Sequence, residues 1–166
     1  HVESGVAKSG NQKHSVSGVM VEGMSGCMVK FAKCCTPVPG DEITGFITRG
    51  YGVSVHRTDC PNVAISRHKP EEKDRWIAVT WDADSQNTYK TALELTAKDR
   101  NDLALDVAMV LSAAKLRVLS LVANSVPDGY AKISALLEVK DRADVVTVMN
   151  KLNQISDVYE VRRVSG

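Results

Sequence analysis

The sequence predicts an α+β protein built in two parts, a small strand-rich domain followed by a unit of four strands and two helices. Short apolar stretches with period-two alternation dominate the chain up to residue 82. A polar segment at residues 83–88 interrupts the pattern, and strands and helices then alternate regularly to the end. With 43% hydrophobic residues, the chain can build a packed core.

Composition divides the chain into four segments. Residues 1–18 are rich in glycine, serine and polar side chains without periodicity, which is typical of a flexible linker. We therefore expect a linker at 1–18, a first domain at 19–82, a linker at 83–88 and a second domain at 89–166. Because the chain begins at His1 rather than methionine, we expect it to be part of a longer protein. No apolar run approaches the roughly 20 residues that span a bilayer, so we expect no membrane contact.

The first domain is predicted to consist of short strands and one short helix. The expected strands are Val19–Val21, Met28–Phe31, Ile43–Thr48, Val53–His56 and Trp76–Trp81. The glycine-rich segment 49–52 is expected to close a hairpin between the third and fourth strands. Pro61 predicts a helix that starts directly after Cys60, because proline suits the first helical position.

The second domain shows helical periodicity twice, each time between alternating strands. The expected strands are Tyr89–Ala97, Val118–Ser125, Tyr130–Val139 and Val158–Val164. Apolar residues at 3.6-residue spacing predict a helix that residues 99–102 cap, and Asp141 is expected to cap a second helix. The order βαββαβ predicts a ferredoxin-like fold, with both helices on one face of an antiparallel sheet.

Four potential metal ligands lie between residues 33 and 60. Cys34, Cys35, His56 and Cys60 have the types and the number that hold one tetrahedral zinc ion, and a zinc with four protein ligands would be structural. The spacing is equally compatible with ordinary reduced cysteines and a surface histidine, since adjacent ligands are less usual than a Cys-x-x-Cys pair. Cys27 lies in an apolar run and is expected to be a small core residue.

Charge excludes a domain that binds nucleic acid through a global positive field. Residues 1–88 contain ten Lys/Arg and ten Asp/Glu, and residues 89–166 contain eleven and ten. Any RNA contact must come from a local basic and aromatic patch. The candidates are Lys30, Lys33, Arg49, Tyr51 and Arg57. These residues also fit a solvated hairpin with scattered charges.

The segment KFAKCCTPVPGDEITGFITRGYGVSVHRTDCPN, residues 30–62, resembles the zinc-finger domain of long RelA/SpoT-family enzymes. This domain is also called the RIS domain, and the family makes and hydrolyses (p)ppGpp in the bacterial stringent response. The following βαββαβ unit, with Asp99-Arg100 before its first helix and VYEVRRV at its end, is similar to their ACT domain. The resemblance covers residues 19–166. It implies that Cys34, Cys35, His56 and Cys60 are zinc ligands.

The resemblance implies a regulatory region without catalytic activity of its own. Nothing in the sequence resembles the family's hydrolase or synthetase motifs, and in this family the catalytic domains lie N-terminal to this region. The resemblance therefore implies that the parent protein is a cytoplasmic GTP pyrophosphokinase and (p)ppGpp hydrolase. The implied partners are the ribosome with deacylated tRNA and the catalytic domains of the same chain.

ACT domains often bind amino acids where the first strand meets the first helix. The corresponding candidates are Asp99, Arg100, Asn101, Asp102 and Leu103. The usual motif is Asp-Arg-x-Gly-Leu, and Asp102 stands in place of the glycine. Its carboxylate adds bulk and repels a ligand carboxylate, although it can pair with the ligand ammonium. Sensing of a branched-chain amino acid is therefore one alternative function, and a homodimer through the edge strand Val118–Ser125 is another.

Overall fold

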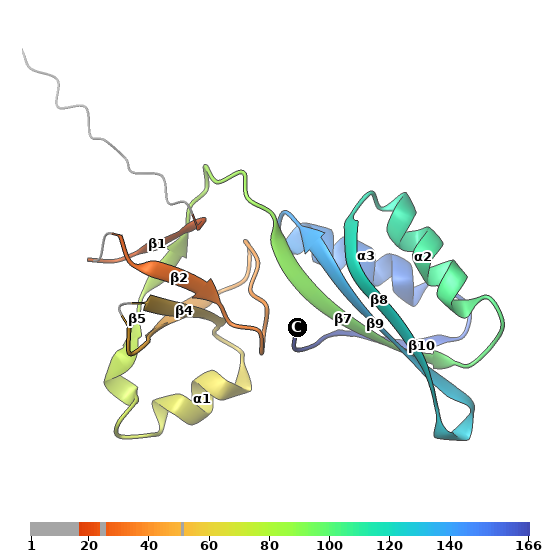
Figure 1. Cartoon of the computed structure of the whole chain (residues 1–166), viewed down its shortest axis with the longest axis horizontal. Coiled ribbons are helices and arrows are strands. Elements are labelled where there is room, and N and C mark those ends of the chain that lie inside the picture. The colour runs from red at the N-terminus through yellow and green to blue at the C-terminus, as the bar shows by residue number, and fades with distance from the viewer. Residues whose placement is uncertain (1–16, 24–25, 51) are drawn as a thin grey trace, which may run out of the picture.

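The computed structural model describes residues 17–23, 26–50 and 52–166 of the chain. It has two parts, each built around its own four-stranded sheet, and the C-terminal end of the chain lies between them (Figure 1). The predicted α+β class is confirmed. Of the candidate residues, Tyr51 lies outside the described residues.

The first part contains a sheet of order β2-β4-β3-β5 and a two-stranded sheet of β1 and β6. The bounds are β1 Val19–Val21, β2 Met28–Phe31, β3 Ile43–Ile47, β4 Gly52–Arg57, β5 Trp76–Ile77 and β6 Val79–Trp81. Strands β3 and β4 form the expected antiparallel hairpin, and β2 joins β4 in parallel. Buried valines from both sheets form a small core between them. A short helix, α1 (Pro61–Arg67), and a 3₁₀ turn, η1 (Lys73–Arg75), follow the hairpin.

The prediction of a single strand at residues 76–81 is wrong. The segment breaks at Ala78, so that β5 pairs with β3 in one sheet and β6 pairs with β1 in the other. Ile77, Val79 and Trp81 nevertheless pack on the same small core. The apolar alternation therefore continues through the break, which is why periodicity alone could not reveal it.

The second part has the predicted topology, an antiparallel sheet of order β10-β7-β9-β8 with two helices on one face (Figure 1). The bounds are β7 Tyr89–Lys98, α2 Leu103–Ala113, β8 Arg117–Val126, η2 Pro127–Gly129, β9 Tyr130–Val139, α3 Arg142–Asn153 and β10 Val158–Arg163. Leu93 and Leu95 of β7 and Leu111 of α2 are fully buried in the layer between helices and sheet.

The two predicted helix caps differ in the structure. The Asp141 carboxylate accepts a hydrogen bond from the Asp144 backbone N–H at 3.0 Å, so it caps α3 as expected. Asp102 occupies the N-cap position of α2 but makes no side-chain cap bond, and its φ of 64° is left-handed.

The two parts meet through aromatic side chains. The Phe31 ring stacks on Trp81 with centroids 5.7 Å apart, and both rings contact Tyr89 edge-on at 5.4 and 5.3 Å. Val38, from the segment between β2 and β3, is fully buried in the core of the second part. These contacts fix the relative position of the two sheets. Among the described residues, no helix is long and apolar enough to cross a membrane.

Candidate metal centre

The four predicted ligands converge at one end of the first sheet. Cys34 and Cys35 follow β2, and His56 lies near the end of β4. Because β2 and β4 run parallel, with Phe31 opposite Val55, the residues after β2 reach the same end as His56. Cys60 is the N-cap residue of α1.

The ligand atoms lie close enough to one another to share one metal ion. All four lie within 4.8 Å of one another. The Cys34 sulfur is 3.4 Å from His56 Nδ1, 3.6 Å from the Cys60 sulfur and 3.9 Å from the Cys35 sulfur. Ideal tetrahedral zinc, with bonds of about 2.3 Å to sulfur and 2.0 Å to nitrogen, would separate two sulfurs by about 3.8 Å and sulfur from nitrogen by about 3.5 Å. The set is able to hold one metal ion and is compatible with zinc.

Burial shifts the pKa values of two of these ligands, Cys35 and His56. Cys35 and Cys60 are almost inaccessible to solvent. Burial, with smaller contributions from the neighbouring thiols, raises the pKa of Cys35 to about 12, and burial also lowers the pKa of His56. Without metal, Cys35 therefore remains a thiol and His56 remains neutral near pH 7. A metal ion that binds here must displace thiol protons.

Neighbouring groups fix the orientation of the ligands. The Arg57 backbone N–H donates to the Cys35 sulfur at 3.3 Å, and Ser54 Oγ lies 3.4 Å from His56 Nε2. The Trp76 ring packs edge-on against the imidazole at 5.5 Å, while its indole N–H donates to Ser66. Such supporting contacts set the tautomer and the ring angle of a metal-binding histidine. In the sequence, only the alternation that places Ser54 and His56 on one face of β4 points to these contacts.

Comparisons with known proteins match both halves of the chain. Residues 19–82 match the model of the RelA/SpoT RIS domain, and residues 85–163 match that of the ACT domain. The chain is a RIS–ACT region of the RelA/SpoT family. We call residues 19–82 the RIS domain and the βαββαβ unit the ACT domain from here on.

Named relatives agree with this assignment. The bifunctional (p)ppGpp synthase/hydrolase RelA of Mycobacterium tuberculosis is 40% identical over 149 residues, which are 90% of this chain and 20% of that protein. The GTP pyrophosphokinase of Escherichia coli K12 is 37% identical over 158 residues, 94% of this chain and 21% of that protein. The chain thus spans about a fifth of the length of these relatives and corresponds to a C-terminal regulatory region.

The solved structures include an ACT domain from the GTP pyrophosphokinase of Chlorobium tepidum. It is 22% identical, covers 47% of this chain and all of that chain, and has a TM-score of 0.43.

The predicted RNA-contact residues do not form one patch. Lys30, on β2, and Arg49, at the tip of the β3–β4 hairpin, are exposed. Lys33 is also exposed but lies beside the metal ligands at the other end of β2. Arg57 is half-buried at that same end, and its guanidinium lies 3.1 Å from the Asp59 carboxylate. The exposed candidates are therefore Lys30, Lys33 and Arg49.

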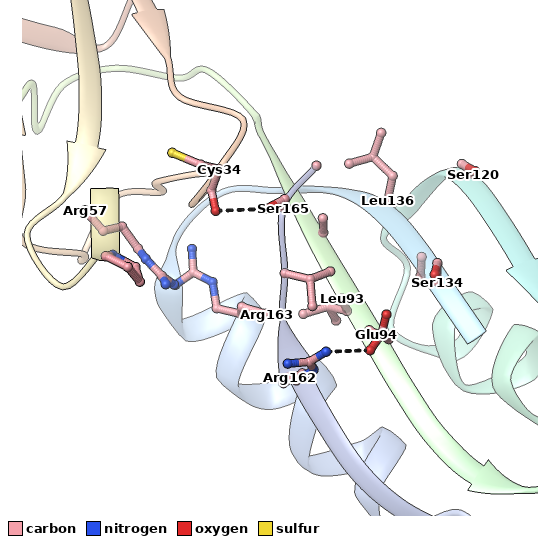
Figure 2. Close-up of a pocket in the computed structure, with 15 residues that line it drawn as sticks. Cys34, Arg57, Leu93, Glu94, Ser120, Ser134, Leu136, Arg162, Arg163 and Ser165 are labelled. Atoms are coloured by element: carbon pink, nitrogen blue, oxygen red, sulfur yellow. Dashed lines mark hydrogen bonds and ion pairs between the residues drawn. The ribbon is translucent and has the colours of Figure 1, made fainter. Parts of the chain in front are cut away.

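Arg57 faces the ACT domain instead of open solvent. It lines a cavity of about 720 Å³ together with Cys34 of the RIS domain. The opposite wall is the helix-free face of the ACT sheet, with Glu94 and Ser134, and the C-terminal segment from Arg162 onward (Figure 2). Arg57 is thus better placed to act between the two domains than to contact RNA directly.

Two of the amino-acid candidates, Arg100 and Asp99, are already bonded to neighbouring residues of the ACT domain. The Arg100 guanidinium donates to Asp106 at 2.8 Å and to the Ser156 carbonyl at 3.1 Å, and lies 3.2 Å from the Asp157 carboxylate. Asp99 accepts a hydrogen bond from the Ser125 hydroxyl at 2.7 Å. The remaining candidates are the exposed Asn101 and Asp102 and the buried Leu103, which packs in the core.

Proposed function

We propose that this chain is the regulatory end of a stringent-response (p)ppGpp synthetase/hydrolase, and that its RIS domain is shaped by a structural zinc ion. The convergence of Cys34, Cys35, His56 and Cys60 is the observation that supports this most directly. Four protein ligands close the coordination sphere, so the ion would stabilise the fold without taking a substrate. Catalysis is assigned to other domains of the parent protein, and this chain is proposed to be non-catalytic.

The proposed role of the RIS domain is to contact the ribosome when deacylated tRNA is bound, in the cytoplasm. Lys30, Lys33 and Arg49 are exposed cations on one small domain, and such side chains contact RNA phosphates. The ACT domain would relay ribosome binding to the catalytic domains of the parent protein. The RelA name of the M. tuberculosis relative supports this assignment by family alone.

Co-sedimentation of the zinc-loaded chain with ribosomes, with and without deacylated tRNA, tests the proposal. Arg49→Glu and Lys33→Glu should each weaken binding and reduce its salt dependence, because each phosphate contact contributes roughly one unit to the slope of log affinity against log salt. Lys73→Glu, an exposed charge change on η1 of the same domain, is the matched control. Equal binding by all three variants would remove the assigned surface, and no binding by the unaltered chain would remove the role.

Homodimerisation is a second candidate, favoured by strand β8. This ten-residue strand is the exposed edge of the ACT sheet, and Val118 and Val122 on it are 39% and 48% exposed. An unpaired edge of this length is able to pair with a second copy. Sedimentation equilibrium across protein concentrations should then show a dimer that Val122→Lys weakens. A constant monomer mass would exclude it.

Amino-acid sensing at Asp99–Leu103 remains a prediction. The internal bonds of Arg100 and Asp99 would have to be exchanged for bonds to a ligand, which lowers affinity. Titration of the chain with leucine, isoleucine and valine, followed by backbone-amide NMR, tests it. Saturable shifts confined to this turn would establish a sensor.

A further inference from the structure

Residues 33–41, the metal loop, contact the metal site on one side and the ACT domain on the other. The loop follows β2 and belongs to no strand or helix. The side chains of Cys34 and Cys35 point into the ligand cluster. The backbone carbonyls of Cys34 and of three other loop residues accept hydrogen bonds from the C-terminal segment at β10 and from the start of α3. One short segment thus serves both sites.

The C-terminal segment of the ACT domain donates three hydrogen bonds to loop carbonyls. They are Gly166 N–H to Lys33 at 2.7 Å, the Ser165 hydroxyl to Cys34 at 3.3 Å and the Arg163 guanidinium to Thr36 at 2.9 Å. Figure 2 shows Ser165 directly beside the Cys34 backbone, with the Cys34 sulfur on the far side. The ACT domain therefore holds the predicted metal ligand Cys34 through the Cys34 backbone carbonyl.

A buried ion pair anchors the other end of the loop. Arg163 makes two parallel bonds of 2.9 Å to the Asp41 carboxylate, which is almost completely buried. Asp41 also accepts the Val38 backbone N–H, and its carbonyl accepts the Trp81 indole N–H, both at 2.9 Å. Two-pronged pairing of this kind is strong and geometrically specific.

The loop also packs closely on the start of α3. The Arg142 N–H donates to the Pro39 carbonyl at 2.7 Å, and a Cβ added to Gly40 would lie 2.9 Å from the Arg142 Cβ. Gly40 has a φ of +100°, which favours glycine on conformational grounds as well. With Val38 buried in the ACT core, the loop has no room to shift while the domains stay docked.

From these contacts we propose that metal binding and docking of the ACT domain onto residues 33–41 are one coupled equilibrium, centred on the Arg163–Asp41 pair. Ordering a loop costs backbone conformational entropy. The event that orders the loop first therefore lowers the entropic cost of the other event. The coupling is reciprocal, because each event changes the equilibrium of the other by the same factor. This inference rests on the proposed zinc site and names how that site is regulated.

The first test compares zinc affinities by competition with a chromophoric chelator. Arg163→Gln removes the bond pair to Asp41 and should weaken zinc binding about tenfold, within the 5- to 150-fold range typical of coupled sites. Arg162→Gln is the matched control, since this neighbour bonds Glu94 on the ACT sheet and does not touch the metal loop. Arg162→Gln should leave the zinc affinity within about twofold of the unaltered chain.

The second test uses the unaltered chain and reads docking directly by amide hydrogen exchange. The Arg142 and Gly166 N–H groups donate across the domain boundary to Pro39 and Lys33, so zinc should slow their exchange by at least about tenfold. The Leu95 N–H, on the central strand β7 of the ACT sheet, serves as the internal control and should not change. This measurement remains decisive even if Arg163→Gln fails to fold.

Either of two results would overturn the inference. One is an equal zinc affinity of Arg163→Gln and Arg162→Gln. The other is an amide exchange rate at Arg142 and Gly166 that does not change when zinc is added. A chain that binds no zinc would overturn it as well, together with the zinc part of the proposed function. Neither test contains ribosomes, so a failure of ribosome binding is a separate result that leaves this coupling intact.

Discussion

The RIS and ACT domains are stabilised by different means. Among the described residues, the ACT core is one cluster of sixteen buried side chains of its own plus Val38, whereas the RIS domain has two clusters of four. Cys35 and Cys60, two of the four predicted metal ligands, belong to one of these small clusters. Small domains with so little core need additional cross-links such as a structural metal. We therefore expect the ACT domain to form on apolar burial alone and the RIS domain to depend on metal binding for its stability.

The largest expected effect is therefore loss of the metal site. Cys60→Ser should abolish the thermal transition of the RIS domain while the ACT transition persists, because structural zinc contributes roughly 10–16 kcal/mol of apparent folding free energy in small zinc domains. Differential scanning calorimetry separates the two transitions, and near-UV circular dichroism follows Trp76 and Trp81, both in the RIS domain.

Cys27→Ser is the control for this comparison. Cys27 is a half-buried thiol that packs beside the small valine core and lies outside the ligand cluster. Cys27→Ser should therefore lower the thermal stability of the RIS domain far less than Cys60→Ser does. An equal loss of stability in both variants would mean that ordinary thiol packing, and not metal binding, stabilises the RIS domain.

The second effect in size is a cavity in the ACT core. Leu111→Ala removes a fully buried side chain of α2 and should lower the free energy of unfolding of this domain by about 2–5 kcal/mol. Leu105, on the same helix, is 56% exposed, and Leu105→Ala should change it by at most about 0.5 kcal/mol. Urea unfolding at saturating zinc measures both. If Leu111→Ala shifted the unfolding transition of the RIS domain as much as that of the ACT domain, the contrast between the two domains would fail.

The same contrast explains how much of the molecule the sequence could predict. The ACT elements follow from periodicity, because its strands and helices are long and bury one face. The Cys/His cluster of the RIS domain follows from residue type, because few side chains bind metal ions. The strand at residues 76–81 could not be predicted correctly, since Ile77, Val79 and Trp81 pack on one core across the break at Ala78.

The contacts between the two domains could not be predicted from the sequence. Arg163 and Asp41 are 122 positions apart, and each is an ordinary charged residue in its local pattern. Val38 lies in a proline-rich turn, yet it completes the core of the other domain. Only the relative placement of the two sheets brings these residues together, and that placement depends on side-chain fit, which no periodicity encodes.

A smaller effect should come from Asp102, the residue that departs from the ACT motif. Its φ of 64° is left-handed, which is strained for most side chains and free of cost for glycine. Asp102→Gly should therefore stabilise the ACT domain by about 0.5–1 kcal/mol in urea unfolding. The exposed Asn101→Gly is the control and should not stabilise. Destabilisation by Asp102→Gly would show that the attraction between the Asp102 carboxylate and Arg100 outweighs the backbone strain at residue 102.

The smallest effect concerns pH and the exposed side of the ACT sheet. A hydrogen bond from Arg162, at 2.8 Å, holds the pKa of Glu94 below its usual range, with Lys132 adding to the shift. Because the pKa is lowered in the folded state, Glu94 stabilises the domain above its unfolded pKa of about 4.3, and this contribution disappears as pH falls through the folded value. Solvent screening limits it to about 1 kcal/mol or less. Glu94→Gln should accordingly lower the ACT melting temperature slightly at pH 7, and this difference should shrink as the pH falls below the unfolded pKa. Glu71→Gln, in the RIS domain, should leave the melting temperature unchanged throughout. A difference between Glu94→Gln and the unaltered chain that did not shrink at low pH would assign the effect to packing instead of charge.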